Sequence, residues 1–396
     1  MHPDLSTAFL RWALIRAAFA RGWWLTTALY LVVVADLSPF ELLLLGTFQG
    51  LTVVIAEVPA GVLADAVSRR LALVVAHVVM GAGMAMTGFV TAFSLLVVSQ
   101  CLWGLGWALS SGADVAWITD ELDRPDLIDR VLTAQARMDM LGNPIGIVGF
   151  AALAWATTLS TATFVAGLAM IALGVLVVAR WPEARFAPVD AGRRWAESAA
   201  IFRRGIAVAR ADRVILVVLA ATLLVNGSGE GFGRLFERRL VLLGMPTEPD
   251  PIVWFAAIGL VSAAIGAITL RFVEDRIECT GVAKRVYVAA CVAAVAGLLV
   301  FTHAPNTPSA VAGSLLVSGI GYPTTRVAGT IWVNRRTTSD VRATVHSLLS
   351  QSENAGEIIF GLALALIAGS TSSTVALTGC AVLLAGAAVV MRRASE

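Results

Sequence analysis

Two carboxylates near the end of the chain have a spacing that suits proton binding. Glu353 and Glu357 lie four residues apart in an apolar stretch, and His346 and Ser350 precede them at helical spacing. Residues four apart share one face of a helix, so two ionised acids at these positions would repel each other. At least one is therefore expected to bind a proton during a functional cycle. The alternative is a structural stripe paired with Arg326, which lies at similar depth in the preceding apolar stretch.

Other charged residues also fall inside apolar stretches, where a charge costs about 2.5–3.5 kcal/mol on insertion scales and usually faces a bundle interior. Asp114 and Glu230 are further candidates for proton coupling. Glu230 lies in a glycine-rich run, 226–233, that predicts a broken helix forming an outer gate or, alternatively, a local kink. In the first half of the chain, we expect these charges either to hold the helices together through ion pairs or to form a gate. The residues expected to form a charge network or line a cavity are Arg16, Arg21, Glu57, Arg137, Arg326, Arg234 and Asn354.

The elements that must position these residues are long apolar segments. Of 396 residues, 58% are hydrophobic and 14% are charged, against roughly a quarter charged in soluble domains. The mean hydropathy is +0.82. A helix needs about 20 apolar residues to cross a bilayer. The sequence predicts twelve such segments, at 12–35, 41–64, 71–92, 95–118, 132–155, 161–180, 213–238, 252–273, 285–302, 309–333, 342–368 and 374–391.

The longest connection divides these segments into two sets of six. We expect an N-terminal bundle at 1–180, a linker at 181–212 and a C-terminal bundle at 213–396. Within the linker, Trp195 and Ile201 stand among paired arginines, which predicts an amphipathic helix on the inner membrane face. Basic residues collect in the even-numbered loops and at both ends, whereas the odd-numbered loops carry almost none. The positive-inside rule therefore predicts a multi-pass protein of the bacterial inner membrane with both termini cytoplasmic.

The two halves show a weak internal repeat. The fourth segment contains Gly104-Leu105-Gly106-Trp107 followed by Trp117, and the tenth contains Gly319-Ile320-Gly321-Tyr322 followed by Trp332. Both features recur at an offset of 215 residues. Internal repeats are typical of transporters, whose substrate sites lie between the repeats near the membrane midplane. The predicted fold is therefore an all-α polytopic membrane protein with twelve transmembrane helices in two pseudo-symmetric six-helix bundles.

The connection between the second and third segments carries a motif, Gly61-Val62-Leu63-Ala64-Asp65-Ala66-Val67-Ser68-Arg69-Arg70. Its glycine, aspartate and basic pair resemble the loop 2–3 signature of the major facilitator superfamily, and the preceding Glu57-Val58-Pro59-Ala60 resembles efflux-type members. The resemblance implies that Gly61, Asp65, Arg69 and Arg70 form a conformational latch. Gly61 would permit close helix approach, and Asp65 would face the positive end of the eleventh helix, near Thr338–Asp340 with Ser339 as N-cap. The alternative is a solvated surface turn.

The fifth segment contains Gly142-Asn143-Pro144-Ile145-Gly146-Ile147-Val148-Gly149, which partly resembles the glycine–proline motif of drug–proton antiporters. Asn143 replaces a glycine of that motif, and a packing kink explains the same residues. The fourth segment has Gln100 where many antiporters carry an arginine. The proton relay implied by the family cannot be transferred to that position.

No phosphate-binding loop, metal-binding cysteine or histidine cluster, or nucleophile elbow is present, so we expect no enzyme activity, no metal and no cofactor. An ion gradient remains as the energy source. The leading hypothesis is a monomeric drug–proton antiporter that exports hydrophobic or cationic small molecules, with protons and the bilayer as partners and no nucleic acid. The alternatives are a proton symporter or facilitator for a polar metabolite, and a membrane sensor or scaffold that transports nothing.

Overall fold

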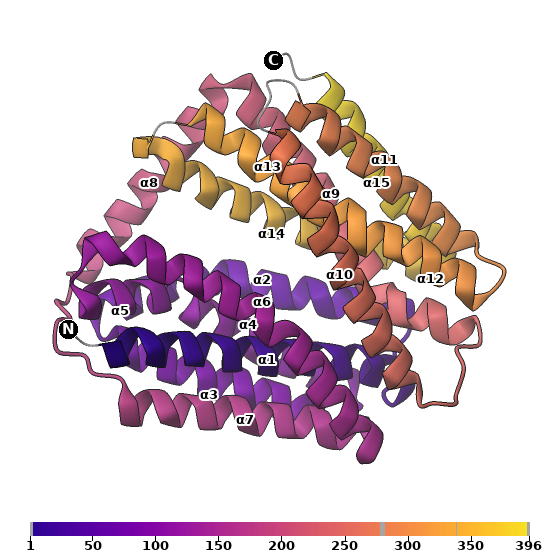
Figure 1. Ribbon diagram of the computed structural model, residues 1–396, viewed down its shortest axis with the longest axis horizontal. Coiled ribbons are helices and arrows are strands. Elements are labelled where there is room, and N and C mark those ends of the chain that lie inside the picture. Colours follow the sequence, from indigo (N-terminus) through magenta and orange to yellow (C-terminus); the bar gives the residue numbers. More distant parts are fainter. Residues whose placement is uncertain (1–2, 278–281, 338, 394–396) are drawn as a thin grey trace. The chain divides into compact units, whose positions relative to one another are not determined.

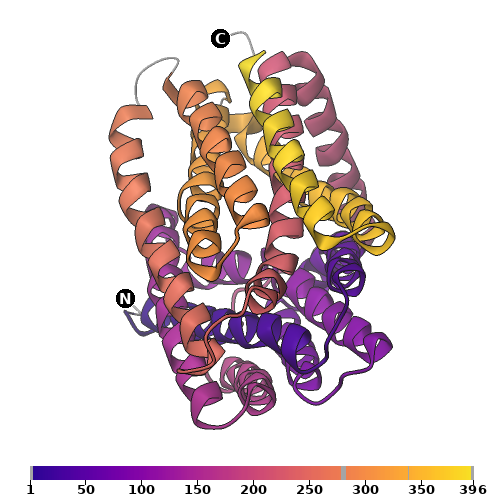
Figure 2. The same ribbon diagram turned by 90° about the vertical axis from the view of Figure 1, so that its right-hand side faces the viewer.

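The computed structural model describes residues 3–277, 282–337 and 339–393, and these residues form helices and connecting loops without strands. Figures 1 and 2 show the helices from two directions. The chain divides into two compact units, one of residues 1–36 and 48–198 and the other of residues 37–47 and 199–396.

The first half of the chain contributes seven described helices before the linker. They are α1 (Pro3–Val33), α2 (Pro39–Ala66), α3 (Arg69–Thr87), α4 (Phe93–Ser110), α5 (Ala113–Leu122), α6 (Pro125–Ala156) and α7 (Leu159–Arg180). The linker helix is α8 (Ala191–Ala211). α4 and α5 form one membrane segment that is interrupted at Gly112, whose φ of 78° is a left-handed conformation that glycine adopts without strain.

The second half repeats this arrangement. Its elements are α9 (Arg213–Leu242), α10 (Pro251–Ile277), α11 (Val282–His303), α12 (Thr307–Leu315), the π-helix η1 (Leu316–Gly321), α13 (Tyr322–Arg336), α14 (Ser339–Ser370) and α15 (Ser373–Arg392). α12, η1 and α13 form one segment, the counterpart of α4 and α5. A π-turn inside a helix is often found at functional sites.

Ten helices in the described ranges are long and apolar enough to cross a membrane. The two remaining segments have physical reasons to fall outside that set. α1 is long but carries Arg11, Arg16 and Arg21, and the α12–η1–α13 segment is interrupted by its π-turn. With these two, the twelve predicted segments are all helical, as expected for two pseudo-symmetric six-helix bundles in the membrane.

The internal repeat corresponds to equivalent helix packing in the two units. A Cβ on Gly106 would lie 2.6 Å from Met80 Cβ on α3, and one on Gly321 would lie 2.5 Å from Ala294 Cβ on α11. Gly104 approaches the backbone of α2 and Gly319 approaches α10. Because α3 and α11 are the third and ninth segments, each glycine pair makes the same two contacts in its own unit.

The glycines of the fifth segment also have a packing role. A Cβ on Gly142 would meet Ala17 Cβ of α1 at 2.9 Å, and Gly146 lies against the backbone of Ala18. Gly149 has no described atom within 4 Å of its Cβ position. The close approach of α6 to α1 therefore explains Gly142 and Gly146 without any antiporter function.

The predicted break at the glycine run 226–233 is wrong. α9 is a continuous helix from Arg213 to Leu242. A Cβ on Gly227 would lie 2.5 Å from the Phe360 ring of α14, and one on Gly231 would lie 2.5 Å from Cys380 Sγ of α15. The glycines allow α14 and α15 to lie close to α9, which keeps its helical hydrogen bonds.

Candidate functional site

The second unit holds a cluster of intramembrane charges that begins on α9. Arg234 Nε donates to Glu230 Oε1 at 2.7 Å, one helical turn away, and both side chains are largely buried. A Cβ on Gly46 would lie 2.7 Å from Arg234 Nε and would overlap the Glu230 carboxylate. Glycine at position 46 therefore leaves room for this ion pair beside the start of α2.

A second ion pair joins α13 and α14. Arg326 Nη2 lies 3.8 Å from Glu353 Oε2, as the sequence-based alternative of an Arg326 partner anticipated. The Arg326 side chain is 77% exposed, whereas that of Glu353 is 27% exposed. This pair is longer and more open than Glu230–Arg234, so Arg326 is the cation that a ligand could compete for most easily.

Glu357 is the third acid of the cluster. Four charges act on it, namely the acids Glu230 and Glu353 and the arginines Arg234 and Arg326. In the described part of the chain, no arginine lies within ion-pair distance of its carboxylate. The two neighbouring acids are each paired, so Glu357 carries the negative charge that the two arginines leave unbalanced.

A cavity of about 490 Å³ opens beside this cluster within the second unit. Its lining includes Arg326 and Glu353, together with the polar side chains of Asn226, Tyr287 and Tyr322. Tyr322 Oη lies 3.0 Å from Ser228 Oγ, which donates to the Cys380 carbonyl. The cavity therefore joins the two ion-pairing groups of α13 and α14 to hydroxyl and amide groups of α9, α11 and α13.

The rest of the predicted α14 stripe has other roles. His346 Nε2 lies 2.6 Å from Asn334 Oδ1 on α13, toward the start of α14. Asn354 is half-buried and is not among the residues that line the cavity. At the far end of α9, the Arg238 and Arg239 guanidiniums donate to backbone carbonyls, those of Leu37 and of Thr302 and Ala304 respectively.

The first unit has a smaller charged site at Arg16. Its guanidinium lies 3.8 Å from Asp114 Oδ2 and donates to Ser110 Oγ at 3.1 Å. It also lies over the rings of Trp12 and Trp107, at 5.2 and 5.4 Å from their centroids. Arg16 is therefore held by one acid, one hydroxyl and two aromatic faces.

The charge network expected in the first half is seen here only for part of its members. Arg16 and Asp114 meet, but Arg137 is exposed and lines an open pocket of about 400 Å³ with Asp126, Asp129 and Arg130. The α6 residues near Asp114 are instead Gln135 and Asp139. Gln135 Nε2 lies 3.4 Å from Asp114 Oδ2, and the Asp139 carboxylate interacts electrostatically with Arg16 and Asp114. Positions 135 and 139 share one face of α6, whereas 137 lies on the opposite side. Arg21 is exposed on α1, and Glu57 is half-buried on α2.

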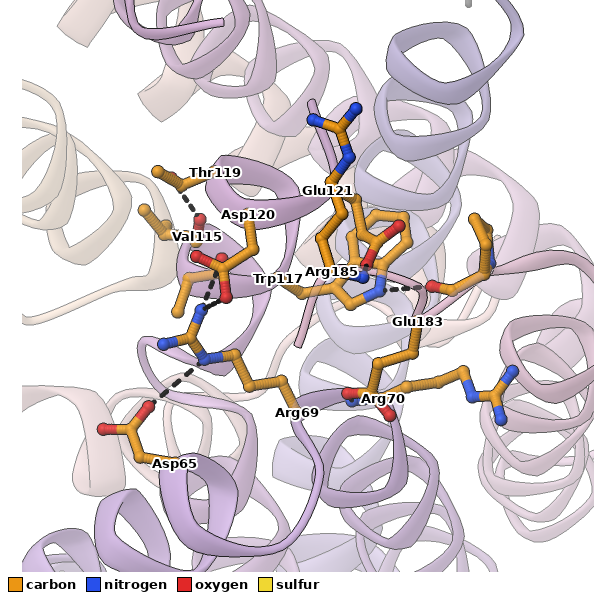
Figure 3. Close-up of polar contacts among 12 residues, drawn as sticks. Asp65, Arg69, Arg70, Val115, Trp117, Thr119, Asp120, Glu121, Glu183 and Arg185 are labelled. Atoms are coloured by element: carbon orange, nitrogen blue, oxygen red, sulfur yellow. Dashed lines mark hydrogen bonds and ion pairs between the residues drawn. The ribbon is translucent and has the colours of Figure 1, made fainter. Parts of the chain in front are cut away.

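The loop between α2 and α3 is held by ion pairs within the first unit (Figure 3). Arg69 Nε donates to Asp65 Oδ1 at 3.2 Å, and its Nη1 pairs with Asp120 at the end of α5 and donates to the Ala116 carbonyl. In Figure 3, Arg69 lies between the two aspartates. Ser68 caps α3 by accepting from the Leu71 amide.

The segment after α7 binds the same loop. Glu183 accepts from the Arg70 amide at 2.9 Å and from the Ser68 hydroxyl, and Arg70 donates to the Trp181 carbonyl. From α8, Arg194 Nη2 lies 2.6 Å from Asp65 Oδ2. Asp120, Glu183 and Arg194 were not predicted as site residues, although the charged residues of this loop require partners of opposite charge.

Outside the membrane segments, the charges of α8 pair along the helix surface. Arg193 Nε donates to Glu197 Oε1 at 2.8 Å, and this hydrogen bond lowers the pKa of Glu197. The acid is exposed, so the pair contributes little to stability.

Two expectations for the latch do not match the structure or lie beyond it. A Cβ on Gly61 would meet no described atom within 4 Å, so the close helix contact expected at this glycine is not made. The eleventh membrane helix, α14, begins at Ser339, but Thr338 and the side chains of Ser339 and Asp340 lie outside the described residues. In the first unit, the Asp65 carboxylate is paired with Arg69 and Arg194.

Comparisons with known proteins agree with this architecture. The family model of the Major Facilitator Superfamily matches residues 12–356. No curated protein sequence matches the chain. Among solved structures, the nucleoside transporter NupG, in a mutant form, has a TM-score of 0.79 at 13% identity, with 98% of each chain covered.

Two further solved structures are similar. A bacterial homologue of the human lysosomal transporter Spinster, in an inward-facing and occupied conformation, has a TM-score of 0.75 at 13% identity, covering 99% of this chain and 97% of its own. A mutant of the peptide transporter POT in complex with sulfate has a TM-score of 0.73 at 14% identity, covering 97% and 92%. At these identities the likeness concerns the fold alone. With a family match over most of its length and two six-helix bundles, the chain belongs to the major facilitator superfamily.

Proposed function

We propose that the protein is a proton-coupled efflux transporter for hydrophobic or cationic small molecules, working by alternating access. The observation that supports this most is the composition of the cluster around Glu357. Three acids stand against two arginines, which leaves one negative charge in excess in a membrane segment. Such an excess is expensive at membrane depth, and binding one proton removes it.

Coupling follows from the position of Glu353 and Arg326 at the cavity. When the proton leaves Glu357, its carboxylate competes with Glu353 for Arg326, and a cationic substrate in the cavity competes with Arg326 for either acid. Proton and cargo then bind in alternation. One charge moving across about 100 mV releases about 2.3 kcal/mol. That supports a gradient of roughly fiftyfold for an uncharged substrate moved with one proton, at about 1.4 kcal/mol per decade.

The test is pH-jump-driven flux in proteoliposomes, with a panel of dyes and antibiotics as substrates. Glu357→Gln imitates the protonated acid permanently, so it should abolish uphill transport while downhill exchange continues. Glu353→Gln should also abolish uphill transport, because Arg326 can then pair with Glu357 and no excess charge remains for a proton to remove. Glu197→Gln on α8 is the matched control and should transport as the wild type does. Full uphill transport by the Glu357→Gln/Glu353→Gln double variant would move the proton site to Asp114 or Glu230.

A second candidate is a proton symporter or facilitator for a polar metabolite. The cavity lining supports it, since Thr222, Asn226, Ser318, Thr325 and Thr330 offer hydroxyl and amide groups. Everted vesicles separate the two by direction, because an exporter accumulates its substrate inside them and an uptake system does not. A sensor or scaffold, the third class, would show no flux of any substrate in either assay.

We also propose the orientation that the arginine asymmetry supports, with both termini on the cytoplasmic side of a bacterial inner membrane and the protein acting as a monomer. The linker 181–212 would then lie on the inner face between bundles 1–180 and 213–396. Cysteine placed at Thr247 should react with an impermeant reagent in intact cells, and cysteine at Asp190 should not. Labelling at position 190 in intact cells would show that the proposed orientation is wrong.

A further inference from the structure

Four tryptophans of α1 and α4 form a continuous ladder in the first unit. The rings of Trp23 and Trp103 are nearly parallel, with centroids 5.8 Å apart, and those of Trp103 and Trp107 are 5.5 Å apart with planes 9° from parallel. Trp24 contacts both Trp23 and Trp103, at 6.0 Å from each. Because Trp103 and Trp107 are four residues apart on α4, their rings stack along one helix face.

The ladder combines a buried base with exposed ends. Trp23 is fully buried, and its indole N–H donates to the Met84 carbonyl. Trp24 and Trp107 are 37% and 42% exposed. The Arg16 guanidinium lies on Trp107 and is tied to Asp114, and an arginine at membrane depth faces a polar or protein-lined space rather than lipid. The exposed surface beside Trp107 therefore borders a polar space.

Two hydrogen-bond donors beside the ladder have no partner among the residues that the structure describes. Gln100 is only 1% exposed, and its Nε2 amide group makes no hydrogen bond in the described structure. The Trp103 indole N–H is buried and equally unpaired. Gln100, Trp103 and Trp107 follow the helical spacing of one face of α4. Buried donors without acceptors are rare, and each one is expected to meet water or a ligand.

We propose that this ladder binds flat aromatic molecules that carry a hydrogen-bond acceptor. The ligand lies across the exposed parts of Trp24 and Trp107, and the side chains of Gln100 and Trp103, whose donors are buried in this structure, turn toward its carbonyl or ring-nitrogen acceptor to donate hydrogen bonds. Arg16 already places a positive charge on Trp107, so the ladder favours neutral ligands over permanent cations. The inference rests on the proposed export function, and it narrows the substrate class from hydrophobic or cationic molecules to planar neutral acceptors.

The geometry is more specific than structural packing requires. A purely structural stack, such as the fully buried Phe9, Trp12 and Trp117 group of the same unit, needs no exposed rings and no free donors. In that group Trp12 donates to His77 and Trp117 to the Pro182 carbonyl. Both indoles are thus satisfied, whereas the ladder leaves its central indole without an acceptor.

The test is equilibrium dialysis of the full chain in nanodiscs, with empty nanodiscs subtracted and no gradient applied. Three neutral probes separate the features of the ligand. Xanthone is planar with a carbonyl acceptor, fluorene is planar without one, and dicyclohexyl ketone has the carbonyl without aromatic rings. The proposal predicts saturable binding of xanthone, weaker binding of fluorene and the weakest binding of dicyclohexyl ketone.

Variants then locate the site. Trp107→Leu should weaken xanthone binding by about tenfold, the scale of one lost aromatic stack. Trp103→Phe keeps a ring and removes the N–H. It should therefore weaken the binding of xanthone by about threefold, as expected for one hydrogen bond, and leave the binding of fluorene unchanged. Trp155→Leu is the matched control, since this tryptophan of α6 is 64% exposed and lies outside the ladder. If Trp107→Leu does not fold, Trp24→Leu takes its place, since Trp24 also presents an exposed ring of the ladder.

The outcomes are separable from those of the flux assay. Glu357→Gln should bind xanthone as the wild type does, whatever its transport. Equal binding of xanthone by the wild type, Trp107→Leu and Trp24→Leu would overturn the inference, as would equal binding of all three probes or no saturable binding of xanthone. Loss of binding in the ladder variants together with uphill transport by Glu357→Gln would support the ladder and refute the proton site.

Discussion

The α4–α5 segment and the α12–η1–α13 segment occupy equivalent places in the two units and pack through equivalent glycines, but they present different chemistry. At the offset of 215 residues, Trp103 and Trp107 of the first correspond to Ser318 and Tyr322 of the second. Ser111 corresponds to Arg326. The first segment carries stacked rings and an acid, and the second carries hydroxyls and a cation.

The difference shows which residues maintain the scaffold and which are free to vary. The glycines contact neighbouring backbones, where any larger side chain would collide, so both halves need them. The other residues of these two segments are not held by such close backbone contacts, so their side chains can differ between the units. In the second unit they line a polar cavity beside the acid cluster, and in the first they extend an aromatic ladder toward Arg16.

The largest effect is expected from replacing the shared glycines. Gly106→Leu and Gly321→Leu should each lower stability by about 3 kcal/mol, the upper end of the usual cost of overpacking. Gly106→Leu should be the more harmful, because its Cβ would meet backbone atoms, Ala76 O and Met80 N at 2.7 Å, whereas Gly321 first meets the Ala294 methyl group. Thermal unfolding in detergent measures both. Gly149→Leu is the control, and an equal loss there would show that leucine is poorly tolerated at any helix glycine.

Replacing the arginines Arg16 and Arg326 should lower stability by less than replacing the glycines does. Arg16 is largely buried among Asp114, Ser110 and two tryptophans, so Arg16→Gln should lower stability by about 1–3 kcal/mol by leaving Asp114 without its cation. Arg326 is mostly exposed with a long ion pair, so Arg326→Gln should cost under about 1 kcal/mol. The same unfolding measurement compares them. If the two variants lose equal stability, the contrast between a fixed and an available arginine is wrong.

The smallest stability effects are expected where α5 meets the loop between α2 and α3. Asp120→Asn removes one partner of Arg69 and should destabilise by about 0.5–1 kcal/mol, since the partly exposed Asp120 leaves Arg69 with Asp65. Asp65→Asn should cost somewhat more because it loses both Arg69 and Arg194, and it should also slow transport if Asp65 forms the proposed latch. Flux at the wild-type rate for purified Asp65→Asn would remove the latch role. Arg194→Ala separates the linker contact from the latch.

Much of the scaffold could be predicted because it follows from local physics. Twelve apolar segments of membrane-spanning length require helices, since the bilayer supplies no partners for backbone polar groups. The repeat at Gly104 and Gly319 is visible in the sequence because close helix packing tolerates only the smallest side chain. The same local physics gave a wrong prediction at 226–233. Several glycines there indicate a broken helix, but α9 is continuous and the glycines allow α14 and α15 to pack closely against it.

The partners of the charged residues could be predicted only where spacing along one helix decides them. The spacing of Glu230 and Arg234 gives their ion pair, and depth along the membrane gave Arg326 as the partner of Glu353. Arg137 was expected beside Asp114, but the rotation of α6 presents Gln135 and Asp139 there. Depth is read from residue number, whereas the face that a helix turns to its neighbours depends on how whole helices pack.

The sequence by itself determined the membrane-spanning helices, their division into two repeats and the presence of charged residues within the membrane segments. Tertiary structure alone decided that, among the described residues, Glu357 has no ion pair whereas its two neighbouring acids do. It also decided that four tryptophans from two helices form one ladder beside two donors without a partner in the described structure. The physical reason is range. Helix formation and membrane insertion depend on neighbours within a few turns, whereas the charge balance and stacking of a site depend on side chains that only packing brings together.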